Sequence, residues 1–305
     1  MPKIEYKEIR FTRPSLQLIE TANAILSEYT GRGLTVTLRQ LYYQFVARDF
    51  IPNKQTEYKR LGALINDARL AGLIDWNQLQ DRTRKLMGRN HWNTPGEVIQ
   101  SAAYSYHRDL WTGQKQRVEV WIEKDALVGV IERICHRYDV PFFSCRGYTS
   151  QSEMWAAAQR LKDYKATGQA VTIIHMGDHD PSGKDMTRDI QERLAMFGAG
   201  AKVERIALNI NQIRQYNPPP NPAKLTDTRA TDYIEEFGPD SSELDALDPD
   251  VLVSLLREQI ESRIQASKFE KIQADIERER QILNATANHW PEIETHVRKN
   301  WKDEI

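Results

Sequence analysis

The segment that decides the fold of this chain is Val171-Thr172-Ile173-Ile174-His175-Met176-Gly177-Asp178-His179-Asp180-Pro181-Ser182-Gly183. Its first half is an apolar, β-branched run, which predicts a buried strand. The strand ends at Gly177, and two carboxylates, Asp178 and Asp180, follow one residue apart. Because two carboxylates at the end of a buried strand repel each other, we expect a positive group between them. A hard divalent cation is the simplest candidate, and a polar loop that only ends the strand is the alternative.

Strands and helices alternate on both sides of this segment. Strands are expected at 118–122, 140–144, 171–176 and 202–208, and helices at 126–138, 151–164 and 184–196. This alternation predicts a parallel sheet with helices on its faces. In such sheets, ligands bind at the carboxyl ends of the strands. Glu123 ends the first strand, so we expect it to share one crevice with Asp178 and Asp180 and to form a magnesium site there.

Two other interpretations of the segment are less favoured. Residues 177–184 superficially resemble a phosphate-binding Walker A loop, but the spacing between Gly177 and Gly183 is one residue too long, and Asp185 stands where Ser or Thr is needed. His175 and His179 have the chemistry of zinc ligands. His175 lies inside the strand, however, where a histidine is more often buried with its hydrogen bonds satisfied.

The N-terminal region is expected to contain three helices. The first begins near Pro14, the second follows Thr37 as its N-cap, and the third spans 56–71. A short strand is expected at 73–74. Three short helices followed by a small hairpin predict a winged helix with the third helix as the groove-reading element, and a generic three-helix bundle is the alternative.

The second of these helices carries a tyrosine beside an arginine. Its core stripe is formed by Leu38, Leu41, Tyr42 and Phe45. Tyr43 falls off that stripe and lies four residues after Arg39, on the same flank. We therefore expect a tyrosine hydroxyl to project from the flank of the helix beside a guanidinium.

Charge is unevenly distributed along a chain whose formal net charge is only −1. Lys and Arg predominate between residues 32 and 89, which predicts a local anionic partner, with a solvated helical surface as the alternative. Asp and Glu predominate between 227 and 250. That acidic stretch has three open interpretations: it packs against the parallel-sheet core, faces the basic region, or is solvated.

The two cysteines, Cys135 and Cys145, form no CxxC pair, which argues against a zinc site and suits a reducing cytoplasm. We find no signal peptide and no apolar run near 18 residues, so we expect no membrane association.

Several motifs together resemble a known family. Glu123-Lys124-Asp125 after one strand and residues 178–183 after another resemble the Toprim domain. Combined with Arg39-Gln40-Leu41-Tyr42-Tyr43, they resemble the A subunit of DNA topoisomerase VI and its relative, the meiotic double-strand-break transesterase. Arg146-Gly147-Tyr148 resembles the family's basic-Gly-Tyr turn, and Glu243-Leu244-Asp245-Ala246-Leu247 resembles its segment after the Toprim core. The similarity covers about residues 33 to 260.

The resemblance implies an α/β plus helical fold with three consecutive domains. A winged-helix-like DNA-binding domain would span 1–112 and carry the candidate nucleophile. A Toprim metal-binding domain would span 113–215. An acidic and helical extension, 216–305, would pack on the Toprim core or form a dimer interface.

The resemblance also implies magnesium-dependent DNA cleavage by transesterification. Tyr43 would attack a backbone phosphate and form a 5′-phosphotyrosyl link, assisted by Arg39. Mg²⁺ held by Glu123, Asp178 and Asp180 would stabilise the transferred charge. Lys124 would contact the phosphate, as the remaining catalytic residue.

The implied partners are double-stranded DNA, a second copy of the chain and a separate ATPase subunit of the GHKL type. In the family, the tyrosine of one subunit works with the metal site of the other, so a homodimer would be active. The DNA-binding residues would be Lys59, Arg60, Arg69 and Arg146, in a cytoplasmic, nucleoid-associated protein. Two alternatives stay open: a Toprim nuclease that uses a metal-activated water, and a non-catalytic DNA-binding protein that keeps the fold.

Overall fold

The computed structural model describes residues 3–79, 88–222 and 227–301. The chain packs into two compact units, 1–84 with 116–263 and 85–115 with 264–305. Each unit combines segments that lie far apart in the sequence. The domains expected from the sequence, 1–112, 113–215 and 216–305, are consecutive instead. Their boundaries stay a prediction.

The first unit contains a four-stranded parallel sheet in the order β2-β1-β3-β4. Its strands are β1 (Gln116–Ile122), β2 (Phe142–Ser144), β3 (Ala170–Met176) and β4 (Lys202–Ala207). The parallel α/β arrangement predicted from the sequence is confirmed. Ile122 and Met176 are partners at the ends of β1 and β3. Glu123 and Gly177 therefore leave the sheet side by side, which positions the acidic residues of both strands at one edge.

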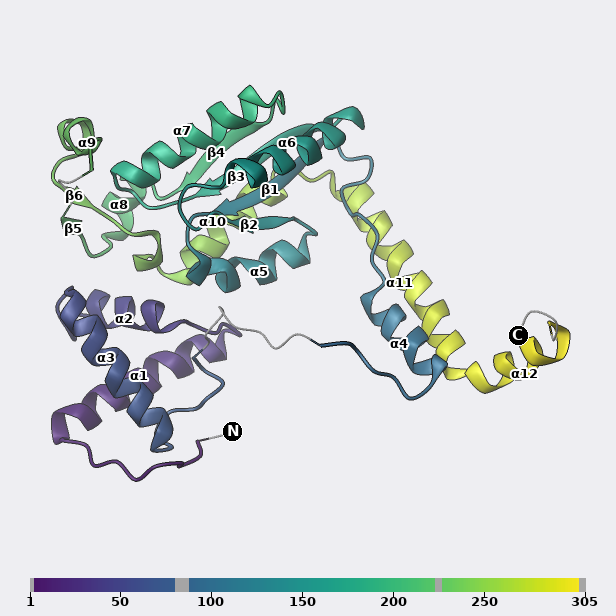
Figure 1. Ribbon diagram of the computed structural model, residues 1–305, viewed down its shortest axis with the longest axis horizontal. Helices are drawn as coiled ribbons and strands as arrows, with labels where there is room; N and C mark the ends of the chain where they lie inside the picture. Colours follow the sequence, from purple (N-terminus) through teal and green to yellow (C-terminus); the bar gives the residue numbers. More distant parts are fainter. Residues whose placement is uncertain (1–2, 80–87, 223–226, 302–305) are drawn as a thin grey trace. The chain divides into compact units, whose positions relative to one another are not determined.

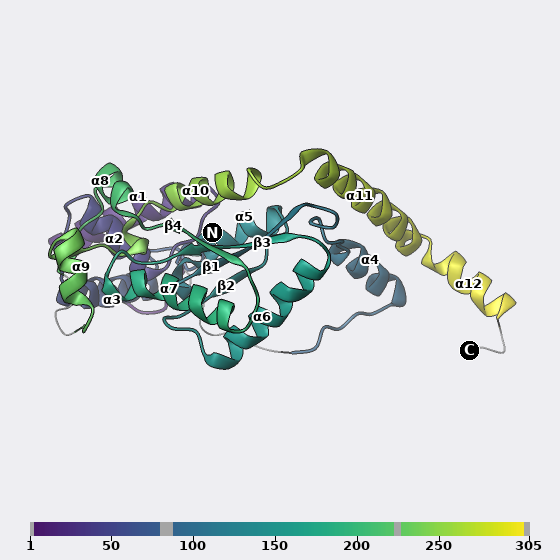
Figure 2. The same cartoon turned by 90° about the horizontal axis from the view of Figure 1, so that it is seen from above.

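Helices cover both faces of this sheet (Figures 1 and 2). One face carries α6 (Gln151–Ala166) and α7 (Pro181–Met196), and the other carries α5 (Val128–Arg137), which follows the short turn η1 (Asp125–Leu127), and α10 (Pro249–Glu261). Trp121 and Ile173 of the sheet are buried against Met154 of α6 and Ile190 of α7. Each such side chain contributes about 1.5–3 kcal/mol of burial free energy, so this apolar contact fixes the helices on the sheet.

Three helices precede the sheet, in the same unit. They are α1 (Arg13–Gly31), α2 (Leu38–Ala47) and α3 (Gln55–Leu70), and they share one apolar core. The predicted N-cap Thr37 is confirmed, because its side chain accepts from the Gln40 amide in a capping box. The strand expected at 73–74 is absent from the described residues; Ala71 makes only an isolated bridge with Glu5. Three helices are thus shown, and the winged helix stays a prediction.

The acidic stretch forms small elements beside the sheet. These are α8 (Ile210–Tyr216), β5 (Asn221–Pro222), α9 (Ala230–Phe237), β6 (Asp240–Ser241) and η2 (Leu244–Ala246). β5 pairs with β6 in an antiparallel ladder, and Ser242 bridges to His179 beyond β3. η2 packs against α2, and Ala246 belongs to the apolar core of the N-terminal helices. Segment 240–247 therefore joins the carboxyl edge of the sheet to α2.

The second unit is built from α4 (Pro95–Ser105), α11 (Ala266–Asn288) and α12 (Trp290–Asn300). α4 lies beside α11 (Figures 1 and 2). Just after α4, the Tyr106 hydroxyl donates to Glu279 at 2.8 Å, and the Arg280 Nε donates to the Tyr106 carbonyl at 2.9 Å. Among the helices of both units, as far as the structure describes them, none is long and apolar enough to cross a membrane.

Candidate functional site

A cleft of about 590 Å³ opens between α2 and the carboxyl edge of the sheet. The residues that line it are Arg39, Tyr42, Tyr43, Asn53, Gln55, Tyr58, Lys124, Asp178, Asp180, Asn221, Pro222, Ser241 and Glu243. The structure therefore brings five of the residues singled out in the sequence to one cleft of one chain. Those five are Arg39, Tyr43, Lys124, Asp178 and Asp180.

The acidic wall is built at the ends of β1 and β3. Glu123 does not line the cleft but lies directly behind it, where its Oε2 accepts from the Asp178 amide at 2.8 Å. Asp178 Oδ1 accepts from the Leu244 amide at 2.7 Å, and its Oδ2 lies 2.9 Å from the Lys124 ammonium. Asp180 Oδ1 accepts from the Gly183 amide at 2.6 Å. Glu123 and Asp180 thus fix the backbone of the loop after β3, and Asp178 fixes the start of η2.

Asp180 has a structural role that the sequence prediction did not include. It is the N-cap of α7, and Pro181 occupies the first turn, so the helix begins three residues before the expected start at 184. A capping aspartate is favoured there because its carboxylate satisfies a free amide and faces the positive end of the helix dipole.

Arg205 on β4 holds the same loop from behind. Its guanidinium is buried and donates to the carbonyls of Gly177 and Gly183, each at 2.9 Å, and to that of Asp178. Burial lowers the pKa of Arg205 to about 10, so the side chain stays charged at neutral pH. The nearby carboxylates of Glu123, Asp178 and Asp180 stabilise this charge, because an unpaired buried guanidinium would be costly.

Two further acids, Glu243 and Asp245, enter the cleft region from the acidic stretch. The Lys124 ammonium lies 2.6 Å from Glu243 Oε2 and 3.0 Å from Asp245 Oδ1. The Arg39 Nε donates to Asp245 Oδ2 at 2.8 Å, and the same guanidinium pairs with Glu243. Of the three interpretations of the acidic stretch, two apply to these residues: they contact the sheet through Lys124 and the basic N-terminal region through Arg39. Their signal in the sequence is the motif Glu243-Leu244-Asp245-Ala246-Leu247, which the family resemblance had already singled out.

These contacts bear on the expected magnesium ligands. Across residues 3–79, 88–222 and 227–301, no three acidic, histidine or cysteine side chains are arranged to hold a metal ion. Ligation by Glu123, Asp178 and Asp180 therefore stays a prediction. Burial raises the pKa of Glu123, and the neighbouring Asp180 raises it further. Burial also raises the pKa of Asp178, and so does Glu123. The carboxylates are thus crowded together in a poorly hydrated place.

The charges at this edge suit a divalent cation. Five carboxylates and three cations act on one another there: Glu123, Asp178, Asp180, Glu243 and Asp245 against Arg39, Lys124 and Arg205. With all eight groups ionised, five negative charges less three positive ones leave an excess of two; burial opposes this state by raising the pKa of Asp178 to about 7 and that of Glu123 above its ordinary value. Carboxylate oxygens are the ligands that Mg²⁺ prefers, so the donor set fits the predicted ion in charge and in chemistry.

Tyr43 lies in the cleft wall, but the expectation that it projects freely from α2 is wrong. Its side chain is 3% exposed, because η2 covers that flank of the helix. The hydroxyl lies near the carboxylates of Asp245 and Glu243. Burial raises the pKa of Tyr43 above its ordinary value, and the carboxylates of Asp245 and Glu243 add to the shift, whereas Arg39 opposes it. In this arrangement the phenol is protonated.

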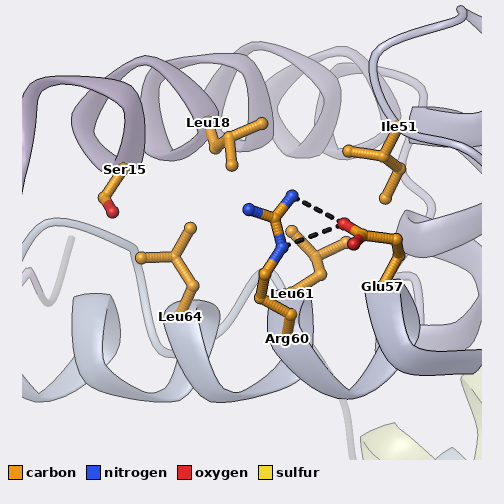
Figure 3. Close-up of a pocket in the computed structure, with 7 residues that line it drawn as sticks. All are labelled: Ser15, Leu18, Ile51, Glu57, Arg60, Leu61 and Leu64. Atoms are coloured by element: carbon orange, nitrogen blue, oxygen red, sulfur yellow. Dashed lines mark hydrogen bonds and ion pairs between the residues drawn. The ribbon is translucent and has the colours of Figure 1, made fainter.

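The predicted DNA-binding residues lie outside the cleft, and three of them are already engaged. Arg60 pairs with Glu57 over a small apolar hollow between α1 and α3 (Figure 3). Arg69 stacks on Trp76, with its guanidinium 4.3 Å from the ring centroid, and Arg146 pairs with Asp125 at 3.1 Å. Lys59 is exposed and has no ion pair within the described part of the chain. The basic residues Arg82, Arg84 and Lys85 lie outside the described residues.

The two histidines are not placed as a zinc pair. His175 is buried, as expected, and its Nδ1 lies 2.9 Å from the Thr187 hydroxyl. His179 Nδ1 lies 2.7 Å from the Tyr233 hydroxyl. Burial lowers the pKa of His175 to about 3 and that of His179 to about 4, so both rings are neutral at pH 7.

Comparisons of the chain with protein-family models, with curated proteins and with solved structures found no match. The family resemblance therefore depends on the motifs and their order alone.

Replacing Gly183 by Ala should destabilise the loop. An added Cβ would lie 2.3 Å from the Asp178 carbonyl oxygen and 3.1 Å from Glu123 Oε2. Because the first of these atoms is backbone, relief requires the loop to move, which we expect to cost about 1–3 kcal/mol of unfolding free energy. Denaturant unfolding measures this change. Gly31→Ala is the control, since nothing lies within 4 Å of its added Cβ. Equal midpoints for the two variants would contradict the prediction.

Stability should depend on pH through Glu243. Burial alone would raise its pKa, but the Lys124 ammonium and the Arg39 guanidinium outweigh burial and lower the pKa from 4.5 to about 2. An acid with a lowered pKa in the folded state stabilises the protein above pH 4.5 and loses that contribution as the pH falls to 2. The contribution is about 3 kcal/mol at neutral pH.

The measurement compares wild type with Glu243→Gln in urea unfolding at several pH values. The difference in unfolding free energy should be largest above pH 5 and shrink towards pH 2. Glu258→Gln, at an exposed position on α10, is the control. A difference that stays constant across this range would mean that Glu243 is not held by its two cations.

Proposed function

We propose that this protein cleaves DNA by magnesium-dependent transesterification, with Tyr43 as the nucleophile. The observation that carries the proposal is the shared cleft, where Tyr43 and Arg39 face Lys124, Asp178 and Asp180. A nucleophile, two cations and an acidic cluster within one cleft match the needs of phosphoryl transfer, which depends on positioning and on stabilisation of charge.

In the proposed reaction, the Tyr43 hydroxyl gives up its proton to water, its oxygen forms a bond to phosphorus as the bond from phosphorus to the 3′ oxygen breaks, and the leaving 3′ oxygen takes a proton from water. A free tyrosine has a pKa near 10, so its oxygen needs nearby positive charge to attack at neutral pH. Arg39 lies 5.8 Å from the ring centroid of Tyr43 and supplies such charge. A DNA phosphate that enters the cleft would compete with Glu243 and Asp245 for Arg39 and Lys124. Magnesium held by Glu123, Asp178 and Asp180 would stabilise the charge that develops on the phosphate and the leaving oxygen.

The proposal includes double-stranded DNA as substrate and a homodimer that cuts both strands. Because one chain carries the tyrosine and the acidic cluster in the same cleft, a single copy has the groups needed for one strand. Passage of another duplex through the break would need a separate GHKL-type ATPase subunit.

A Toprim-like nuclease is the second candidate. The observation that favours it is the burial of Tyr43, whose pKa is raised rather than lowered. In a nuclease, a metal-activated water would attack instead, and Tyr43 would only shape the cleft.

One experiment distinguishes these functions. The wild-type chain is incubated with duplex DNA and magnesium, stopped with denaturant and digested, and the peptides are analysed by mass spectrometry. A nucleotide bound to the peptide at Tyr43 supports the transesterase. Cut DNA with a free 5′ phosphate and no adduct supports the nuclease. Intact DNA that is nevertheless bound supports a non-catalytic DNA-binding protein.

A further inference from the structure

A second groove in the first unit, of about 220 Å³, shares no residue with the cleft. We call it the arginine groove. Its lining residues are Arg32, Leu34, Val130, Arg133, Ile134, Arg137, Asp250, Val253 and Arg257. Four guanidinium groups thus surround an apolar floor. One of them, Arg32, is neutralised by Asp250 of the groove and by Glu28 and Asp248 beside it, which leaves three guanidinium groups in the lining.

The four arginines come from three helical regions. Arg133 and Arg137 lie four residues apart on α5, Arg257 lies on α10, and Arg32 follows the end of α1. Like charges at this spacing on a helix repel each other. Arg32 pairs with Asp250, but Arg133, Arg137 and Arg257 have no ion pair within the residues that the structure describes. These three guanidinium groups are therefore exposed and available to an anion.

Gly33 helps to place Arg133 in the groove. Its φ is +73°, and a Cβ at this position would lie 2.7 Å from the Arg133 Nη1. A side chain here would push the guanidinium aside, so the glycine both permits the turn and lets Arg133 lie over the end of α1. The contact is with the flexible end of the Arg133 side chain, so it shows where this guanidinium lies in the groove.

We propose that the arginine groove binds the phosphate of a phosphate ester, with the apolar floor against the attached sugar or base. Guanidinium groups present several N–H donors in one plane, a geometry that matches phosphate oxygens. The half-buried Leu34 and Val253, packed over the buried Val130 and Ile134, offer a small apolar surface to the organic part of the ligand. The ester is a DNA backbone phosphate or a free nucleotide. The first of these two possibilities rests on the proposed function, in which double-stranded DNA is the substrate.

The test measures binding rather than cleavage. Full-length protein carrying Tyr43→Phe is titrated with a short fluorescent duplex, without magnesium, at several salt concentrations. Adding Arg133→Gln, Arg137→Gln and Arg257→Gln should weaken binding at least about tenfold at low salt. Each lost phosphate contact lowers the slope of log affinity against log salt by about 0.9, so the slope should fall by about 2 to 3. A parallel titration with ATP tests the free nucleotide.

A charge-matched control removes three exposed cations elsewhere, Arg10, Arg214 and Lys271, each replaced by Gln. If the triple groove variant has a smaller salt slope for DNA binding than this control, the groove binds the DNA backbone. If the triple groove variant loses ATP binding but keeps the salt slope for DNA, the groove binds a free phosphate ester. If both ligands bind the groove variant and the control equally well, the proposal is wrong. Arg257→Gln alone is the second variant in case the triple variant unfolds, and its slope should fall by about 0.9.

This result is independent of catalysis. If the wild type forms no adduct and cuts no DNA, the proposed function fails, whereas a changed salt slope would still support the groove.

Discussion

Replacing Tyr43 by Phe is expected to abolish the covalent protein–DNA adduct and to lower the rate of DNA cleavage by about 10³-fold or more. The variant removes the attacking oxygen and keeps the ring, which is buried in the core of the N-terminal helices. The hydroxyl is a single neutral group beside the carboxylates of Asp245 and Glu243, so its loss should cost only about 1 kcal/mol of unfolding free energy. Fold and DNA binding should therefore survive. Denaturing gels measure the adduct and the cut DNA, and thermal unfolding measures the fold.

Tyr42→Phe is the matched control for this variant. Tyr42 lies next to Tyr43 in the chain and lines the same cleft, but its hydroxyl donates to Asn53 Oδ1 at 3.0 Å and to the Lys54 carbonyl at 3.2 Å. The Tyr42→Phe variant loses these hydrogen bonds but keeps the Tyr43 oxygen. We therefore expect it to form the adduct and to cleave DNA as the wild type does. Cleavage that persists in Tyr43→Phe would exclude the transesterase and favour attack by a metal-bound water.

The sheet was predictable from the sequence because its signals are local. Buried parallel strands are short apolar runs, and the helices between them repeat their apolar residues at helical spacing. The cap of α2 was predictable for the same reason, since Thr37 and Gln40 form it within one turn. The convergence of Glu123 with Asp178 followed from the topology, because neighbouring parallel strands end at the same edge.

The burial of Tyr43 was not predictable in this way. Helical periodicity in α2 identifies the stripe that packs on α1 and α3, and Tyr43 lies outside it. The flank is covered instead by η2, some 200 residues further along the chain. Arg205 was missed for a related reason. A charged residue in a strand is ordinarily exposed, and the partners of Arg205 are mainly backbone carbonyls, which no sequence pattern reveals.

Replacing Asp180 by Asn is expected to separate the structural role of this residue from its proposed role in metal binding. The side chain caps α7 by accepting from the Gly183 amide. Asn is as good an N-cap as Asp, so Asp180→Asn should change the unfolding free energy little, whereas Asp180→Ala should cost about 1 kcal/mol. The Asn side chain carries no charge, however, and would reduce the excess of negative charge at the cleft from two to one.

We therefore expect Asp180→Asn to fold normally and to lose magnesium-dependent cleavage by about 10²-fold. A readout without catalysis is the rise in melting temperature when magnesium is added, because an ion that binds only the folded state stabilises it. That rise should be present in wild type and absent in the variant. Asp248→Asn is the control, since Asp248 caps α10 in the same manner and does not line the cleft. If Asp180→Asn keeps both the magnesium-induced rise and cleavage, Asp180 is only the cap of α7, and the excess charge at the edge of the sheet has another purpose.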